Sequence, residues 1–142
     1  MTLGGVRDFF RTRLDGLGYT EWGDGFSSQN IPSTLIDKSY FLEVGKIISR
    51  PANQLHHTFS YPLKIYVFLK GFRDPSAAID NGLADAHLIL DDILDKTVRL
   101  QTNGLKDIRP VSIDVKPLSD SNDNNVVIEM EFDNLLMFTF YN

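Results

Sequence analysis

The chain has 142 residues, of which 42% are hydrophobic and 23% are charged; these values are typical of a soluble globular protein and exclude a disordered chain. Its 14 Lys and Arg against 19 Asp and Glu give a net charge of -5, which argues against a dedicated nucleic-acid binder, because such a protein needs a basic face. The absence of cysteine excludes disulfides, thiolate metal sites and thiol nucleophiles. The length predicts a single domain over residues 1–142.

The first predicted element is an amphipathic helix, capped by Thr2 and stopped by Gly16 and Gly18. Its apolar residues recur at spacings of three and four, at Val6, Phe9, Phe10, Leu14 and Leu17. Charged residues lie within the same stretch, so it is not the apolar core of a signal peptide. No apolar run approaches the roughly 20 residues that span a bilayer, and the chain is therefore predicted to be soluble and intracellular.

Residues 18–39 are rich in Gly, Ser, Asn and Pro and lack periodicity, which predicts a long loop. Loops of this length in compact domains are usually functional or flexible. Trp22, Asp24 and Phe26 are therefore candidate partner-contact residues. The alternative, in which Trp22 only fixes the loop to the core, is equally open.

Residues 40–48 have strand composition, with Gly45 in the place of a bulge, and residues 50–53 read as a turn. The next strand, which begins near residue 61, is the one around which the chain is organised. Leu63, Ile65, Val67 and Leu69 lie on one of its faces, and Lys64, Tyr66, Phe68 and Lys70 on the other. The first face is predicted to meet the helices.

A second helix is predicted from Pro75, with Asp74 as its N-cap. The predicted buried stripe consists of Ile79, Leu83, Ala86, Leu90, Ile93 and Thr97. Gly82 weakens this helix by up to about 1 kcal/mol relative to Ala, unless it permits a close approach of helix to sheet. The outer face carries several aspartates and is expected to be solvated.

After a turn at residues 102–104, two alternating runs at 111–117 and 126–132 predict a hairpin with a polar loop at residues 119–125. The alternation continues to Tyr141 across Asp133-Asn134, which fits a tight turn as well as a break within one strand. The element order predicts an α+β fold, in which a mostly antiparallel four- to five-stranded sheet carries two main helices packed on one face.

The polar hairpin loop contains the strongest metal-like pattern in the chain. Asp120, Asn122, Asn124 and Glu131 occupy positions 1, 3, 5 and 12 of a calcium loop. However, Asn125 stands where the required Gly belongs, and strands rather than helices flank the loop. The pattern therefore favours a polar hairpin loop, and no metal ligand is predicted.

The histidines indicate no catalytic site. His56 and His57 are adjacent in an extended segment and point to opposite faces, so they are predicted to be ordinary strand surface. His87 and Asp91 face each other across one helical turn and are predicted to form a solvated pair. There is neither a nucleophile elbow nor a phosphate loop, so we expect no enzyme activity and no cofactor.

The number of apolar side chains on the strand face away from the helices is more informative about function. If one face of the organising strand meets the helices, Tyr66 and Phe68 face away from them, and large outward aromatic areas usually mark contacts with partners. The alternative is a second layer that the long loop forms. The candidate subunit-interface residues are Tyr66, Phe68, Lys64, Lys70, Met137 and Tyr141. The candidate partner-contact loop residues are Trp22, Asp24, Phe26, Asp120, Asn122 and Asp123.

Two stretches, residues 30–41 (NIPSTLIDKSYF) and the strand and helix over residues 63–94, together with the size and element order, resemble the tail terminator or tail completion proteins of long-tailed bacteriophages. The resemblance implies a structural virion protein without catalytic residues. It forms a ring, typically a hexamer, that ends tail-tube polymerisation and offers a surface for head attachment. The implied partners are further copies of the chain, the tail tube protein and a head connector protein. DNA would pass through without sequence readout, and the implied location is the virion, after assembly in the host cytoplasm and without a membrane.

Two alternatives remain. A head-tail connector or stopper protein of the neck differs from the tail terminator only in its docking partner. A small ligand-binding or hydrolytic α+β domain belongs to a different class, and its pocket would need inward polar residues on the face that carries Leu63 and Leu69. The sequence places none there.

Overall fold

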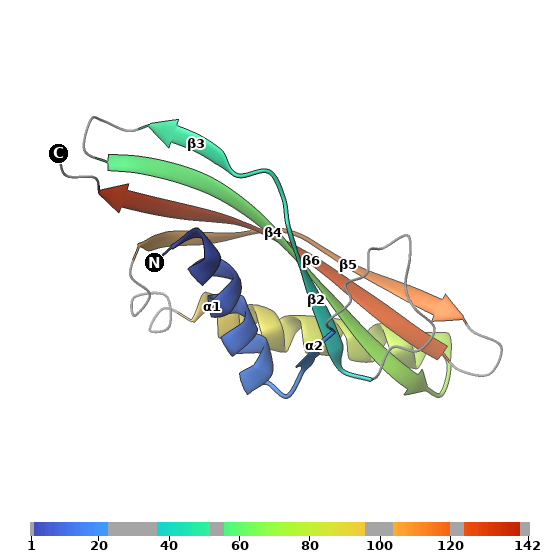
Figure 1. Ribbon diagram of the computed structural model, residues 1–142. Coiled ribbons are helices and arrows are strands. Elements are labelled where there is room, and N and C mark those ends of the chain that lie inside the picture. Colours follow the sequence, from blue (N-terminus) through green and yellow to red (C-terminus); the bar gives the residue numbers. More distant parts are fainter. Residues whose placement is uncertain (1, 23–36, 52–55, 96–103, 120–123, 140–142) are drawn as a thin grey trace.

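The computed structural model describes residues 2–22, 37–51, 56–95, 104–119 and 124–139. It shows two helices packed against an open, mostly antiparallel sheet of six strands, so the predicted α+β class is confirmed (Figure 1). In chain order the elements are α1 (Leu3–Gly16), β1 (Thr20–Glu21), β2 (Ser39–Val44), β3 (Ile48–Pro51), β4 (His56–Phe72), α2 (Pro75–Leu94), β5 (Leu105–Ser119) and β6 (Asn124–Thr139).

The long strands β4 and β6 form the centre of the sheet, whose order is β1-β2-β4-β6-β5. The strand β3 also pairs with β4, beyond the end of β2, and only the short β1 pairs in parallel. As Figure 1 shows, β3 and the adjoining ends of β4 and β6 extend beyond the two helices as an arm. The extra strands β1 and β3 raise the strand count above the predicted four to five.

The prediction for residues 40–53 is partly wrong. The strand does not run on to residue 48, because β2 ends at Val44 and β3 starts only at Ile48. Arg50 and Pro51 belong to β3 rather than to a turn, and residues 52 and 53 lie outside the described ranges. Gly45 explains the interruption: its N–H donates to the Pro62 carbonyl at 2.9 Å, and a Cβ there would lie 2.8 Å from Pro62 Cγ.

The predicted hairpin of β5 and β6 is confirmed, and both strands are longer than expected. Asp133 and Asn134 pair with neighbours on both sides and lie within β6, so this dipeptide is neither a turn nor a break. Pro117 does not end β5. β5 is an edge strand and pairs on one side only. It can therefore contain Pro110 and Pro117, which lack a backbone N–H that a central strand would need for pairing.

Both helices begin where the sequence predicts. The Thr2 hydroxyl accepts a hydrogen bond from Gly5 N at 3.1 Å, and the Asp74 carboxylate accepts one from Ala77 N at 2.7 Å. Val6, Phe10 and Leu14 of α1 are fully buried. Within the described residues, neither helix is long and apolar enough to cross a membrane.

The predicted buried stripe of α2 is confirmed at Ala86 and Ile93 and is wrong by one position at Ile79, Leu83 and Leu90. The buried residues are Ala78, Gly82, Ala86, Ile89 and Ile93, whereas Leu83 is 52% exposed and Thr97 lies outside the described ranges. The reason is Gly82, which faces the sheet so closely that a Cβ there would lie 2.8 Å from Val115 Cγ1 and 3.3 Å from Val126 Cγ2. The close approach selects the small residues as the contact face and turns Leu83 outward.

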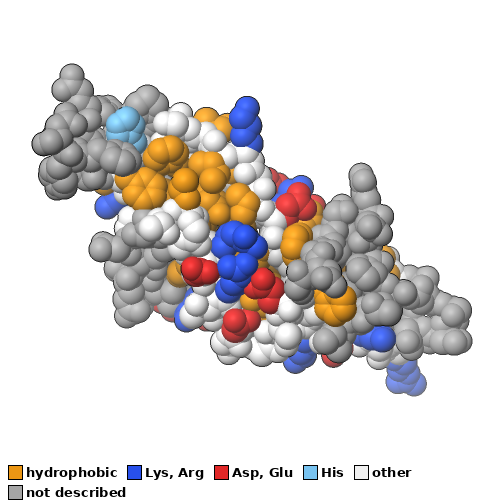
Figure 2. Space-filling view, viewed as in Figure 1, with side chains coloured by type: hydrophobic (Ala, Val, Ile, Leu, Met, Phe, Trp, Pro, Cys, Tyr) orange, Lys and Arg blue, Asp and Glu red, His pale blue; other side chains and the backbone are white. Residues whose placement is uncertain are grey.

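The main core lies between the helices and one face of the sheet. As predicted, Leu63, Ile65, Val67 and Leu69 all face it, and each is at most 2% exposed. Val126, Ile128, Met130 and Phe132 of β6 continue the same surface and are fully buried. On the arm, Phe59 and Phe138 form an edge-to-face pair with ring centroids 5.6 Å apart. Figure 2 shows apolar side chains gathered on the arm, beside the charged side chains of α1.

Candidate interaction surface

Tyr66 and Phe68 face away from the helices, as predicted, but they are not exposed. They are only 2% and 4% accessible and form a second apolar cluster with Val127, against which Trp22, Phe41 and Leu118 pack. Burial, together with the nearby Glu43 and Glu129 carboxylates, raises the pKa of Tyr66. The expectation of outward apolar surface at this place is therefore wrong, because the chain covers it with its own residues. A role for these two residues in subunit contacts remains a prediction.

Trp22 contributes to this second layer from the start of the predicted long loop. Its backbone N–H donates to the Tyr40 carbonyl at 2.8 Å, which holds the residue beside β2. Thus the reading in which Trp22 fixes the loop to the body of the protein agrees with the structure. Asp24 and Phe26, the other two candidate contact residues of this loop, lie outside the described ranges.

A row of alternating charges crosses the same outer face of the sheet. The Glu129 carboxylate accepts a hydrogen bond from Lys116 Nζ at 3.0 Å and lies 3.5 Å from Lys64 Nζ. Lys116 Nζ in turn lies 3.5 Å from the Asp114 carboxylate. Lys64 is therefore engaged within its own chain. Its neighbouring charges are balanced locally, so this row offers weak attraction for a partner.

The remaining candidates from the sequence are separated by the fold. Lys70 is exposed at the end of β4, where its backbone N–H donates to the Asp37 carboxylate at 2.8 Å. Met137 is half-buried in β6, far along the strand from Lys70, and Tyr141 lies outside the described residues. Lys70 and Met137 therefore do not form one continuous surface.

The calcium-like pattern is not assembled where the structure describes it. Asn124 begins β6 and donates from its side chain to the Arg73 carbonyl at 3.3 Å, whereas Glu131 lies seven residues further along the same strand. At roughly 3.3 Å per residue, the two are about 20 Å apart and cannot share one ion. Asp120, Asn122 and Asp123 are outside the described ranges. Among the described side chains, no group of three or more His, Asp or Glu has the arrangement of a metal site.

The prediction for His87 agrees with the structure. His87 Nε2 lies 3.2 Å from Asp91 Oδ2, and the two side chains are 73% and 69% exposed, as expected for a solvated pair. His56 and His57 are consecutive residues of β4.

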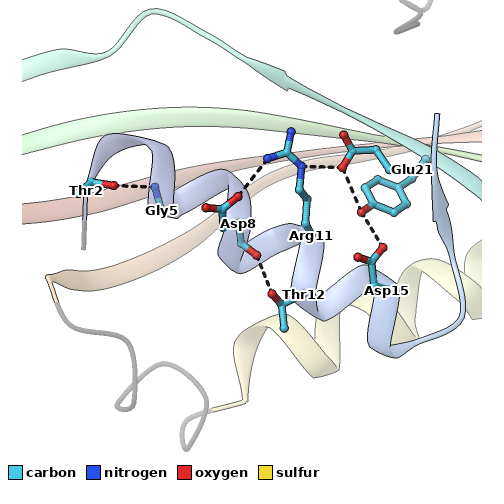
Figure 3. A network of polar contacts seen from close by, with 8 residues as sticks. Thr2, Gly5, Asp8, Arg11, Thr12, Asp15 and Glu21 are labelled. Carbon is cyan, nitrogen blue, oxygen red and sulfur yellow. Dashed lines mark hydrogen bonds and ion pairs between the residues drawn. The ribbon is translucent and has the colours of Figure 1, made fainter. Parts of the chain in front are cut away.

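A partly exposed polar network joins α1 to the β1–β2 end of the sheet (Figure 3). Arg11 Nε donates to Glu21 Oε2 at 2.6 Å and Arg11 Nη1 to Asp8 at 3.1 Å, while the Tyr40 hydroxyl donates to Asp15 at 2.8 Å. Burial raises the pKa of Tyr40, and the Asp15 and Glu21 carboxylates raise it further. The hydroxyl therefore stays protonated and acts as a donor, so the network fixes α1 to the sheet.

The described part of the chain also contains a hollow of about 220 Å³ between β4 and α2. Lys38, Lys70, Asp37 and Asp85 contribute its charges, which balance. The Asp85 carboxylate already accepts a hydrogen bond from the Tyr19 hydroxyl at 2.9 Å, and the Asp37 carboxylate accepts one from the Lys70 backbone N–H at 2.8 Å. Its volume is below the range of about 300 to 1,000 Å³ that is usual for small-molecule sites. The hollow therefore does not favour a ligand-binding role.

A further group of exposed apolar side chains lies along β5, which is an edge strand in the described sheet. The exposed large hydrophobic residues in the described ranges are Leu3, Ile48, Leu83, Leu88, Val111 and Ile113. Val111 and Ile113, which are 56% and 42% exposed, both belong to β5. Val111 is the bulged residue at the register shift between Pro110 and Ser112, so the sheet does not hold it in a regular pair.

One flank of α2 continues this apolar edge. The opposite flank faces α1 and the residues that follow it, because Asp92 lies 3.8 Å from Arg13 Nε and Asp85 accepts a hydrogen bond from the Tyr19 hydroxyl. With about 100° of rotation per residue, Ile79, Leu83 and Leu90 lie on the other flank, toward β5. We define the β5 strip as Ile79, Leu83, Leu90, Val111 and Ile113.

Sequence reasoning missed the β5 strip for two local reasons. It placed Leu83 in the core because the four-residue spacing of large apolar residues outweighed the small residues beside them. Gly82 was the available signal: if a glycine marks the closest approach of helix to sheet, its stripe defines the buried face and Leu83 lies outside. The bulge at Val111 left no signal in the alternation.

No protein-family model matches this chain, and no curated protein matches it significantly. The proposals below therefore depend on the geometry and on the resemblance of the two sequence stretches.

Proposed function

We propose that this protein is a structural subunit of a bacteriophage tail, which forms a ring on the end of the tail tube, stops the polymerisation of the tube and offers a surface to the head. The observation that carries the proposal is the β5 strip, an apolar surface along an edge of the described sheet, in which Leu83, Val111 and Ile113 are exposed. Apolar surface of this kind usually marks a contact with another protein.

The open sheet suits a ring because its two edges differ. On one side the edge is the long strand β5, and on the other it is made by the short strands β1 and β3 together with β2. A contact between two unlike surfaces is heterologous, and it closes into a ring when the rotation between neighbours divides the circle. A ring also has two different faces, which fits one partner on the tube side and another on the head side.

The size of the β5 strip predicts weak association in free solution. Leu83, Val111 and Ile113 are about half exposed. If full burial of such a side chain contributes about 1.5 to 3 kcal/mol, hiding their remaining surface contributes about 3 kcal/mol in total. Association alone costs about 4 kcal/mol or more in lost translational and rotational freedom. We therefore expect mostly monomers in dilute solution, and rings on a tail tube that holds the subunits together.

The tail assignment depends on the two sequence stretches that resemble tail terminator proteins. Under this proposal the partners are further copies of the chain, the tail tube protein and a head connector protein, and DNA passes through the ring without sequence readout. A connector or stopper protein of the neck would use the same β5 strip. The two roles differ in whether the ring binds the tube or the head vertex first.

The test compares two leucines on the same helix. Leu83 and Leu88 are 52% and 57% exposed, but only Leu83 belongs to the β5 strip. Wild-type protein is expected to bind the ends of purified tail tubes as a ring, observed by electron microscopy and native mass spectrometry. Leu83→Ser should lower ring formation at least tenfold, and Leu88→Ser should leave it unchanged. A wild-type protein that stays monomeric at all concentrations and does not bind tubes would refute the proposal.

A further inference from the structure

We infer that the β5 strip receives the β3 edge of a second copy of this chain, with Ile48 as the apolar side chain that docks. The inference specifies the subunit contact of the proposed ring and so rests on the proposed function. Three features of the structure support it: the position of β3, the charges beside the two surfaces, and the prolines of β5.

The first feature is the position of Ile48. It belongs to β3 and is 49% exposed, which makes it the exposed large hydrophobic residue of the β1–β3 side of the described sheet. Within the described residues β3 pairs with β4 alone, so its other edge is free. Figure 1 shows β3 and β5 on opposite sides of the central strands. Each subunit therefore carries one surface for each neighbour in a head-to-tail contact.

The second feature is charge. The helix α2 contains four aspartates and no Lys or Arg. Asp85 is engaged with Tyr19, and Asp92 with Arg13 of α1. This leaves Asp80 and Asp91 exposed near the β5 strip, the latter beside His87. Residues 45–51, which surround Ile48, include Lys46 and Arg50 and no Asp or Glu. The α2 flank of the β5 strip is thus acidic and matches the basic segment, whereas β5 itself carries charges of both signs. Two such acidic flanks repel each other, which disfavours a symmetric dimer through this surface.

The third feature concerns how the contact is made. Pro110 and Pro117 have no backbone N–H, so an unbroken ladder of hydrogen bonds along the outer edge of β5 is blocked. The contact between subunits must therefore come mainly from apolar side chains. An inserted Ile48 side chain provides such a contact, since Leu83 of α2 and Ile113 of β5 both expose apolar surface.

The chain contains no cysteine, which permits a clean cross-linking test. Ile48→Cys and Leu83→Cys are prepared as separate proteins, mixed on tail tubes and treated with a short bifunctional maleimide. We expect cross-linked dimers from the mixture and none from either variant alone. A single chain with both substitutions should give a ladder of covalent oligomers that ends at the closed ring. Ile48→Cys mixed with Leu88→Cys is the control and should not react.

The outcomes separate the inference from the proposed function. Rings that form on tubes without a cross-link between positions 48 and 83 would overturn the inference and leave the function intact. Cross-linking of Leu83→Cys with itself would show the symmetric contact and overturn it too. Specific cross-linking between positions 48 and 83 in concentrated solution, without binding to tubes, would support the contact and count against the tail role. If neither cross-links nor rings form, both proposals fail.

Discussion

Replacing Gly82 by Ala tests the packing of α2 on the sheet, from which the position of the β5 strip follows. The added Cβ would lie 2.8 Å from Val115 Cγ1, about 0.6 Å inside the 3.4 Å at which ordinary contact begins, and 3.3 Å from Val126 Cγ2. Val126 is fully buried, so it has little room to move. Overpacking of this kind costs about 1 to 3 kcal/mol, whereas replacing Gly by Ala within a helix stabilises it by up to about 1 kcal/mol. We expect a net loss of about 1 kcal/mol.

The assay is thermal and urea unfolding of Gly82→Ala beside a matched control, Gly4→Ala. A Cβ at Gly4 would meet only Thr2 Oγ1, at 3.9 Å, so this helical substitution should stabilise the protein by about 0.5 kcal/mol. For a domain of this size a loss of 1 kcal/mol lowers the melting temperature by about 3 °C. If Gly82→Ala stabilised the protein as much as Gly4→Ala, α2 would not contact the sheet at Gly82, and the outward position of Leu83 would lose its explanation.

Two further predictions concern the second cluster and the buried tyrosines. Phe68→Ala should cost about 3 to 5 kcal/mol in urea unfolding, because Phe68 is only 4% exposed; a loss below about 1 kcal/mol with abolished assembly would return the subunit interface to the outer sheet face. Burial raises the pKa of Tyr19, Tyr40 and Tyr66 above the unfolded value of about 10. Above about pH 10 the unfolded chain therefore releases protons that the folded chain keeps. The free energy of unfolding should be constant in this respect below about pH 10 and fall above it. Melting temperatures measured from about pH 8 to pH 11 test this, with Tyr40→Phe expected to show a shallower fall; a flat profile would contradict it.

Local chemistry explains why much of the fold was predictable. Asp74 and Pro75 begin α2 because a capping carboxylate and a preset proline φ act within one turn of chain, whatever the rest of the molecule does. The alternation from Leu63 to Leu69 defines the inner face of β4, because the side-chain period of a strand is two residues. The α+β class followed from the order of such elements.

The sheet as a whole decided where alternation continued and where it stopped. Asp133-Asn134 has the composition of a turn, yet β4 on one side and β5 on the other hold it within β6. Conversely, the strand composition of residues 40–48 is interrupted at Gly45, where the chain passes too close to Pro62 for a side chain. Neither outcome can be read from a single segment, because each depends on the neighbouring strand.

The sequence by itself determined the periodicity of each element and hence which side chains share a face, including the separation of Tyr66 and Phe68 from the main core. Only the tertiary structure decided which of these faces are exposed to water. Trp22, Phe41 and Leu118 pack against the outer aromatic residues, and the contact at Gly82 turns Leu83 toward β5. Exposure depends on segments that are distant in the chain, whereas periodicity is a property of neighbouring residues. For this reason the candidate interaction surface lies at the sheet edge and not, as predicted, on the outer face of the sheet.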